Sequence, residues 1–182
     1  MPNSKLEIVE LDNSEDIREQ LADMLMETVA GGATLNFMHP LAKSAALAFW
    51  QKSFESVASG NRIILGALDG TRLVGTLSIL LDCGDNQSHR CEIGKVMTSL
   101  SHRGKGIGSQ LVAAAERTAR ARQRSLMVVT TATGGTAHNL YERMGFVHAG
   151  TIPYFGSDPY GKMEGCMFYW KQIEAQSQAA AT

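Results

Sequence analysis

The stretch His102–Gln123, HRGKGIGSQLVAAAERTARARQ, decides how this sequence of 182 residues is interpreted. Glycines alternate at positions 104, 106 and 108, and an Ala-rich run with helical periodicity follows at once. A glycine turn that opens a helix leaves backbone N–H groups free at the positive end of the helix dipole, and it lets a phosphate approach closely. The stretch predicts a phosphate-binding turn. The alternative is a turn that only tightens the passage from strand to helix.

The two common nucleotide-binding fingerprints are absent from this turn. A dinucleotide fold requires G-x-G-x-x-G, and counting from Gly104 places Ser109 at the third glycine. A P-loop requires G-K followed by Ser or Thr, but Lys105 is followed by Gly106. The sequence therefore argues against a nucleotide-binding protein of either kind.

The composition limits the partners of the chain. Its formal net charge of -1 gives no basic footprint for nucleic acid. Cys83, Cys91 and Cys166 are too few and too irregularly spaced for a disulfide framework or a CxxC site, which favours a reducing, cytoplasmic location. We expect no signal peptide, no membrane span and no metal site, since no apolar leader, long apolar run or HExxH-like spacing occurs.

Hydrophobic periodicity predicts the element order β-α-α-β-β-β-α-β-α-β-β. The expected strands and helices occupy 6–11, 16–30, 40–59, 61–82 (a hairpin with Asp69-Gly70 at its turn), 90–100, 106–122, 125–131, 136–144, 146–152 and 164–173, with a polar loop at 153–163. Three successive strands followed by alternating helices and strands indicate an α+β (mixed α/β) fold. We expect one domain over residues 1–173 and a flexible tail over 174–182.

Two segments resemble the GCN5-related N-acetyltransferase (GNAT) family. Arg103–Gly108 matches its R/Q-x-x-G-x-G/A signature, and Ala137–Phe146, AHNLYERMGF, matches A-x-x-L-Y-E-x-x-G-F. The resemblance implies a central, mostly antiparallel twisted sheet that is splayed at the fourth strand and flanked by helices. It also implies that the phosphate is the pyrophosphate of acetyl-CoA, whose pantetheine arm pairs with the fourth strand. The implied cofactor contacts are Met97, Thr98, Arg103, Gly104, Lys105, Gly106, Ile107, Gly108, Gly134 and Ala137.

The family resemblance also points to two catalytic candidates. Glu92, on the strand that leads to the cofactor, is the candidate general base that removes a proton from the acceptor ammonium. It could instead be a solvated strand residue or pair with Arg90 or Lys95. Tyr141 is the candidate acid for the leaving thiolate, since a phenol can donate a proton. It could instead be a core aromatic residue.

Further segments, at 27–38, 90–97 and 152–171, resemble a toxin-resistance member of the family, although some positions differ. Gly134 stands where the family usually has Asn, so contacts there would come from the backbone. Thr130 replaces an Asp of that relative, which weakens the case for two carboxylates and for the same toxin. The expected substrate-pocket residues are Asn36, Phe37, Thr130 and Tyr154, and each could equally be ordinary packing.

The resulting expectation is an acetyl-CoA-dependent N-acetyltransferase. It would acetylate a primary amine of a small molecule, which could be amino-acid-like, antibiotic or toxin-like, by direct attack and without a covalent enzyme intermediate. Acetylation of a protein or peptide and a non-catalytic acyl-CoA sensor are the alternatives. A homodimer is suggested by analogy with the family alone.

Overall fold

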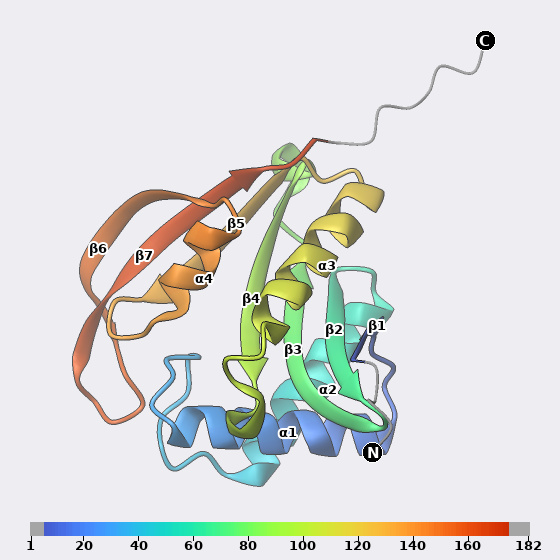
Figure 1. Cartoon of the computed structure of the whole chain (residues 1–182), viewed down its shortest axis with the longest axis vertical. Helices are drawn as coiled ribbons and strands as arrows, with labels where there is room; N and C mark the ends of the chain where they lie inside the picture. Colours follow the sequence, from blue (N-terminus) through green and yellow to red (C-terminus); the bar gives the residue numbers. More distant parts are fainter. Residues whose placement is uncertain (1–5, 175–182) are drawn as a thin grey trace.

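A computed structural model describes residues 6–174 as one sheet with helices on both sides (Figure 1). The tail expected to be flexible lies outside the described residues, apart from Glu174. The strands are β1 (Glu7–Glu10), β2 (Arg62–Asp69), β3 (Arg72–Leu80), β4 (Arg90–Thr98), β5 (Leu126–Ala132), β6 (Val147–Ser157) and β7 (Met163–Gln172). The α-helices are α1 (Glu15–Ala30), α2 (Lys43–Ala58), α3 (Ile107–Ala121) and α4 (Ala137–Arg143).

The sheet has the order β1-β2-β3-β4-β5-β7-β6, and only the β4–β5 pair is parallel. That pair is short: it runs from Arg90↔Leu126 to Ile93↔Val129. Beyond Ile93 and Val129 the two strands diverge, as the separation of β4 and β5 in Figure 1 shows. The mixed sheet splayed at its fourth strand is thereby confirmed.

A β-bulge distorts β4 just beyond the point of divergence. The register with β3 changes between Ser78↔Gly94 and Thr76↔Met97, and Lys95 within the bulge has a φ of 51°. A positive φ is uncommon for a residue with a side chain and marks a locally constrained backbone. The bulge therefore redirects β4 where it leaves β5.

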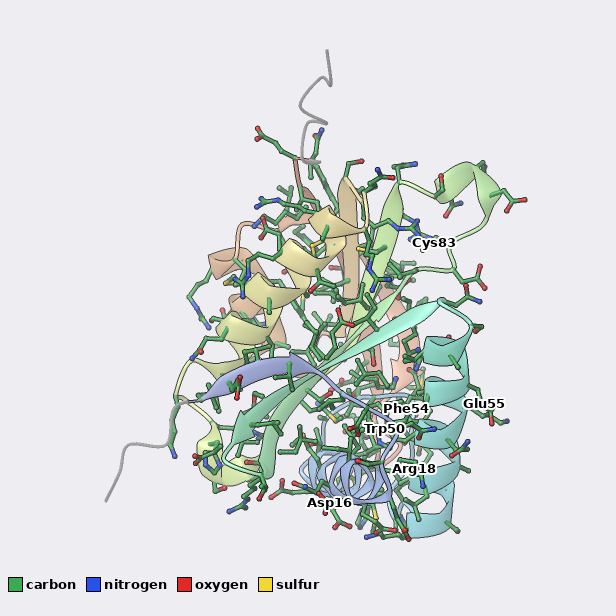
Figure 2. The ribbon with its side chains drawn as sticks, turned by 90° about the vertical axis from the view of Figure 1, so that its right-hand side faces the viewer. Asp16, Arg18, Trp50, Phe54, Glu55 and Cys83 are labelled. Atoms are coloured by element: carbon green, nitrogen blue, oxygen red, sulfur yellow. The ribbon has the colours of Figure 1, made fainter. Side chains whose placement is uncertain are left out.

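Two apolar clusters hold the helices to the two faces of the sheet. Alternate residues of β4, such as Cys91 and Ile93, belong to the cluster that contains α3 and Tyr141 of α4. The other cluster joins α1 and α2 to the opposite face, where Ile64 of β2 lies. Figure 2 shows Trp50 and Phe54 of α2 pointing inward, while Glu55 points away. Because strand side chains alternate, neighbouring residues of β4 face different helices.

Two expected boundaries were wrong. Helix α2 begins at Lys43, not near Pro40, because Leu41 packs against the α1–α2 cluster and the chain is still extended at Ala42. The polar loop expected at 153–163 is shorter, since β6 continues to Ser157 and pairs with Met163. Almost every residue of β6 is exposed, so the strand has no alternation of apolar and polar residues from which to predict it. No helix within residues 6–174 is long and apolar enough to cross a membrane.

Candidate active site

The glycine turn before α3 is open and offers free amides. Gly104 and Gly106 have φ values of 76° and 77°, and a Cβ built at either would meet no atom within 4 Å. Within residues 6–174, no amide from Gly104 to Ser109 donates a backbone hydrogen bond, whereas that of Arg103 donates to Leu100 at 3.4 Å. These free donors at a helix N-terminus suit a diphosphate, with the Arg103 amide already engaged.

The last residues of β4 present an unpaired backbone edge. Met97 and Thr98 pair with Thr76 and Gly75 of β3, but their other edge has no β5 partner because the β4–β5 pairing stops at Ile93. Met97 is buried in the α1–α2 cluster. An extended amide-bearing chain can pair with such an edge as an added strand would.

Glu92 is half-buried on the face of the sheet that α1 and α2 cover. Glu92 pairs with Leu80, the last residue of β3, and with Val128 of β5, one pair before the β4–β5 pairing ends. Arg90 donates to Gln87 at 2.8 and 3.1 Å. Among the described residues no cation lies within 4.0 Å of Glu92. The expected alternative of an ion pair with Arg90 or Lys95 is therefore not formed.

Tyr141 lies on the other face, packed among aromatic rings. Its side chain is 4% exposed, and its ring centroid is 5.8 Å from that of Phe146 and 6.1 Å from that of Tyr169. Its hydroxyl has no hydrogen-bond partner within residues 6–174. Burial raises the pKa of Tyr141, so the phenol stays protonated and keeps its hydrogen available. The same burial makes complete loss of that proton less favourable.

A pocket of about 360 Å³ lies past the point where β4 and β5 separate. Its walls come from the α1–α2 loop, the end of β5, β6 and β7. The polar lining residues are Thr34, Asn36, Thr130, Thr131, Ser157 and Glu164. The others are Phe37, Met38, Ala132, Phe155, Gly156, Gly165 and Cys166.

Three of the four expected pocket residues line this pocket, and one does not. Asn36, Phe37 and Thr130 contribute to its wall. Tyr154 is 79% exposed, has a φ of 54° and does not line the pocket. The β6–β7 register shifts between Ile152 and Gly156, so the strand turns Tyr154 outward and Phe155 into the wall. Tyr154 is thus no wall residue of this pocket.

Two pocket residues on β7 were not anticipated from the sequence. Among the described lining residues, Glu164 is the only charged one. Cys166 lies near Glu92. Burial is the main cause that raises the pKa of the Cys166 thiol, and the charge of Glu92 adds to it. Hydrogen bonds with Thr130 and Thr131 lower this pKa and offset part of the rise. The only sequence signal for Glu164 is an acid in an otherwise apolar stretch, MEGCMFYW, which does not reveal where it points.

The sequence model of the acetyltransferase (GNAT) family matches residues 23–146, more than half of the 182-residue chain. The chain belongs to this family. Solved structures share the fold of this GNAT acetyltransferase. One, from Acinetobacter baylyi ADP1 and assigned as an acetyltransferase, has a TM-score of 0.81 at 20% identity, covering 100% of this chain and 99% of its own.

Two further structures agree with this assignment. A Salmonella typhimurium protein assigned as an acetyltransferase was solved with its cofactor acetyl-CoA; its TM-score is 0.77 at 19% identity, covering 98% of this chain and 100% of its own. A structure assigned as a phosphinothricin N-acetyltransferase has a TM-score of 0.77 at 18% identity, covering 93% of this chain and 99% of its own. Acetyl-CoA is the cosubstrate of the GNAT chain, and the open glycine turn and the free β4 edge fit its diphosphate and amide-bearing arm.

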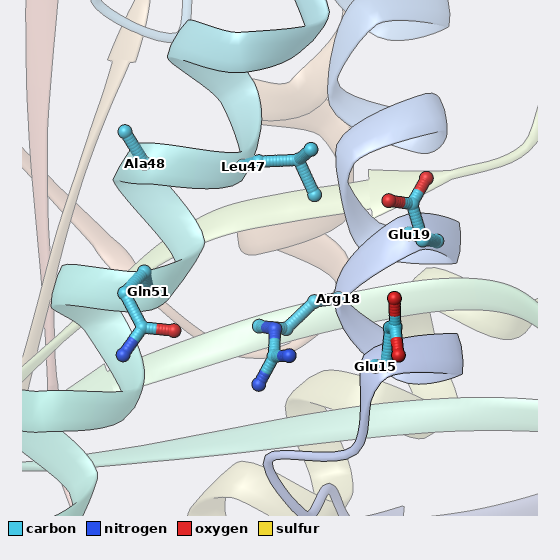
Figure 3. A pocket seen from close by; sticks show the side chains of 6 residues that line it. All are labelled: Glu15, Arg18, Glu19, Leu47, Ala48 and Gln51. Atoms are coloured by element: carbon cyan, nitrogen blue, oxygen red, sulfur yellow. The ribbon is translucent and has the colours of Figure 1, made fainter.

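A second hollow, of about 320 Å³, lies between α1 and α2 of the acetyltransferase (Figure 3). It shares no residue with the pocket at the end of β5. Its most prominent polar group, the Arg18 guanidinium, already donates to the backbone and side-chain oxygens of Asn13 at 2.9 and 2.8 Å. The guanidinium in this hollow is therefore already engaged. Within residues 6–174, no three His, Cys, Asp or Glu side chains gather so as to hold a metal ion.

Proposed function

We propose that this acetyltransferase moves the acetyl group of acetyl-CoA to a primary amine of a small molecule by direct attack. The pocket at the end of β5 carries the proposal. Its volume of about 360 Å³ falls in the range of small-ligand sites, roughly 300–1,000 Å³. Its lining includes Thr130 of β5, directly after the last β4–β5 pair, so we expect an acceptor held there to lie near the cosubstrate.

The proposed cofactor contacts are those expected from the sequence. The amides from Gly104 to Gly108 would bind the diphosphate, with the exposed Arg103 and Lys105 side chains at its edge. Met97 and Thr98 would pair with the pantetheine arm. Gly134 and Ala137, at the loop before α4 and at its first residue, would contact the cosubstrate through their backbone.

The proposed chemistry uses Glu92 and Tyr141 in succession. Glu92 takes one proton from the acceptor ammonium, directly or through a water. The neutral nitrogen attacks the thioester carbon, so that a C–N bond forms and the C–S bond breaks. Tyr141 gives its proton to the departing sulfur, and the second proton released by the nitrogen restores the phenol. The products are the acetamide, the coenzyme A thiol and a protonated Glu92.

The acceptor is proposed to be amino-acid-like, antibiotic or toxin-like. Support comes from the segments that resemble the tabtoxin resistance protein and from the similar structure assigned as a phosphinothricin N-acetyltransferase. This chain differs from the tabtoxin resistance protein at Thr130, which replaces an Asp of that relative, and a threonine cannot act as a carboxylate base. A protein or peptide acceptor would need a groove open at both ends, and the small pocket favours the small molecule.

The test is the release of coenzyme A from acetyl-CoA across amino acids, polyamines, aminoglycosides, a lysine-like β-lactam and N-terminal peptides. Coenzyme A is detected by mass, since three free cysteines would disturb a thiol dye. Release with a small amine supports the proposal. Release with peptides alone points to the protein-directed alternative, and saturable acetyl-CoA binding without release from any amine points to a sensor.

We further propose a single cytoplasmic domain over residues 1–173 that forms a homodimer. One sheet that spans the described chain supports the single domain, and three free cysteines support a reducing compartment. The exposed apolar side chains Val147, Ile152 and Met163 on β6 and β7 support association. Light scattering after size-exclusion chromatography tests the dimer, and a monomer at micromolar concentration would contradict it.

A further inference from the structure

The acceptor pocket has an unbalanced charge. Within residues 6–174, Glu164 is the one charged residue of the pocket lining, and no Lys, Arg or His contributes to its wall. The other polar groups are hydroxyls and one amide, which can bind either a donor or an acceptor. A cation that enters the pocket therefore meets one carboxylate, whereas an anion meets no opposite charge.

The Glu164 carboxylate is held at the wall by two other segments. A Cβ at Gly134, in the loop between β5 and α4, would overlap that carboxylate, so Glu164 occupies space that only a glycine leaves open. Thr34, from the α1–α2 loop, donates its hydroxyl to Glu164 at 3.4 Å. Within residues 6–174 no cation lies within 4.0 Å of Glu164. The Glu164 carboxylate is thus held at the pocket wall without a cation among the described residues to neutralise it.

Lys95 of β4 is turned toward other groups. Lys95 Nζ lies 5.8 Å from the ring centroid of Phe37 and 5.4 Å from that of Phe49, in cation–π contact with both. It does not line the pocket. Burial is the main cause that lowers the pKa of Lys95, and the charge of Arg62 lowers it further, whereas the charge of Glu92 raises it. The Lys95 ammonium is therefore engaged with the two aromatic rings and not with the pocket.

We propose that Glu164 binds the ammonium group of the acceptor, and that the pocket selects primary amines without a carboxylate next to the amine. The inference rests on the proposed function and narrows its acceptor class, because it removes from the amino-acid-like acceptors those that carry a carboxylate next to the amine. Glu164 holds the ammonium by a charge-assisted hydrogen bond, while Glu92 accepts its proton. A carboxylate on the adjoining carbon would lie against Glu164 with no cation to compensate it.

The test compares matched acceptors: tyramine with tyrosine, and phenethylamine with phenylalanine. We expect the wild type to prefer the amine in each pair. Glu164→Gln should raise KM for the amines about 10- to 100-fold, as expected for a lost hydrogen bond to a charged group. It should also reduce the preference for the amine over the amino acid. The matched control is Glu55→Gln, on the outward face of α2, which should change neither KM for the amines nor the preference for the amine.

Gly134→Ala provides an independent variant that leaves Glu164 in the sequence. Gly134 does not have a positive φ, so alanine strains the pocket only by displacing the carboxylate. Gly134→Ala should raise KM for tyramine. This increase should disappear when Glu164→Ala is also present, because the alanine at 134 then has no carboxylate to displace. Additive effects of the two substitutions would contradict the placement of Glu164.

The possible failures are distinguishable. Amine acetylation that Glu164→Gln leaves unchanged, or faster turnover of the amino acid than of its decarboxylated partner, overturns this inference alone and points to Lys95. Acetylation of no amine by wild type that still binds acetyl-CoA overturns the proposed function, and this inference with it.

Discussion

Glu92 and Tyr141 lie on opposite faces of the sheet, next to the opening where β4 and β5 diverge. Glu92 shares its face with the α1–α2 cluster, whereas Tyr141 belongs to the cluster under α3. Without the splay, the sheet would separate the two groups completely. In the proposed mechanism, the divergence beyond Ile93 and Val129 would let Glu92 and Tyr141 approach one thioester from two sides.

Glu92→Gln should lower kcat/KM for the acceptor about 10²- to 10⁴-fold, the usual contribution of a general base. The unfolding midpoint should stay within a few degrees of wild type, because Glu92 forms no ion pair among residues 6–174. Steady-state kinetics and thermal unfolding measure the two quantities. Full activity in the glutamine variant would remove Glu92 from the mechanism.

Tyr141→Phe should lower kcat with little change in acetyl-CoA affinity or stability near neutral pH. The hydroxyl has no hydrogen-bond partner within residues 6–174, so its removal leaves no orphaned group in the core. Kinetics with an acceptor of low amine pKa separate thiolate protonation from amine activation. A loss of stability with unchanged kcat would instead assign Tyr141 to the core.

Cys91 should make the protein less stable in alkali. Burial, chiefly, raises its pKa from 9.0 to about 12. Between these two values the folded state holds a proton that the unfolded state has lost, so stability falls as pH rises. Cys91→Ala should lessen that fall by about 1.4 kcal/mol per pH unit. Urea unfolding from pH 8 to 11 measures it, and parallel stability curves for the two proteins would contradict the assignment.

Gly106→Ala should weaken acetyl-CoA binding beyond its effect on stability. Gly106 has a φ of 77° at the N-cap of α3, where an alanine costs about 1–2 kcal/mol and redirects the free amides. Gly70→Ala is the matched control: Gly70 has a φ of 63° in the β2–β3 turn, and a Cβ there also meets no atom.

Both glycine variants should lose similar stability in chemical unfolding. Only Gly106→Ala should raise the Kd for coenzyme A in calorimetry, by about tenfold, equivalent to roughly 1.4 kcal/mol. An equal change of Kd in both variants, or in neither, would show that the turn does not bind the diphosphate.

The glycine turn and the order of elements could be predicted because they depend on local sequence, whereas the role of Tyr141 was inferred from the family motif and stays a prediction. Gly104 and Gly106 mark their turn by residue type, and the periodicity of 106–122 marks the helix that follows. β6 could not be bounded in this way, because a strand exposed on both sides carries no alternation. Tyr154 was misplaced for a related reason: a register shift decides which side of β6 it occupies.

The amino-acid sequence by itself determined the family, the open glycine turn before α3 and the positions of Glu92 and Tyr141 along their elements. Only the tertiary structure decided which side chains meet in the acceptor pocket. Thr34, Gly134 and Glu164 come from three loops or strands far apart in the chain, and they meet because β7 inserts between β5 and β6. Local periodicity specifies which face a residue occupies within its own element, but the pairing of distant strands fixes what that face contacts.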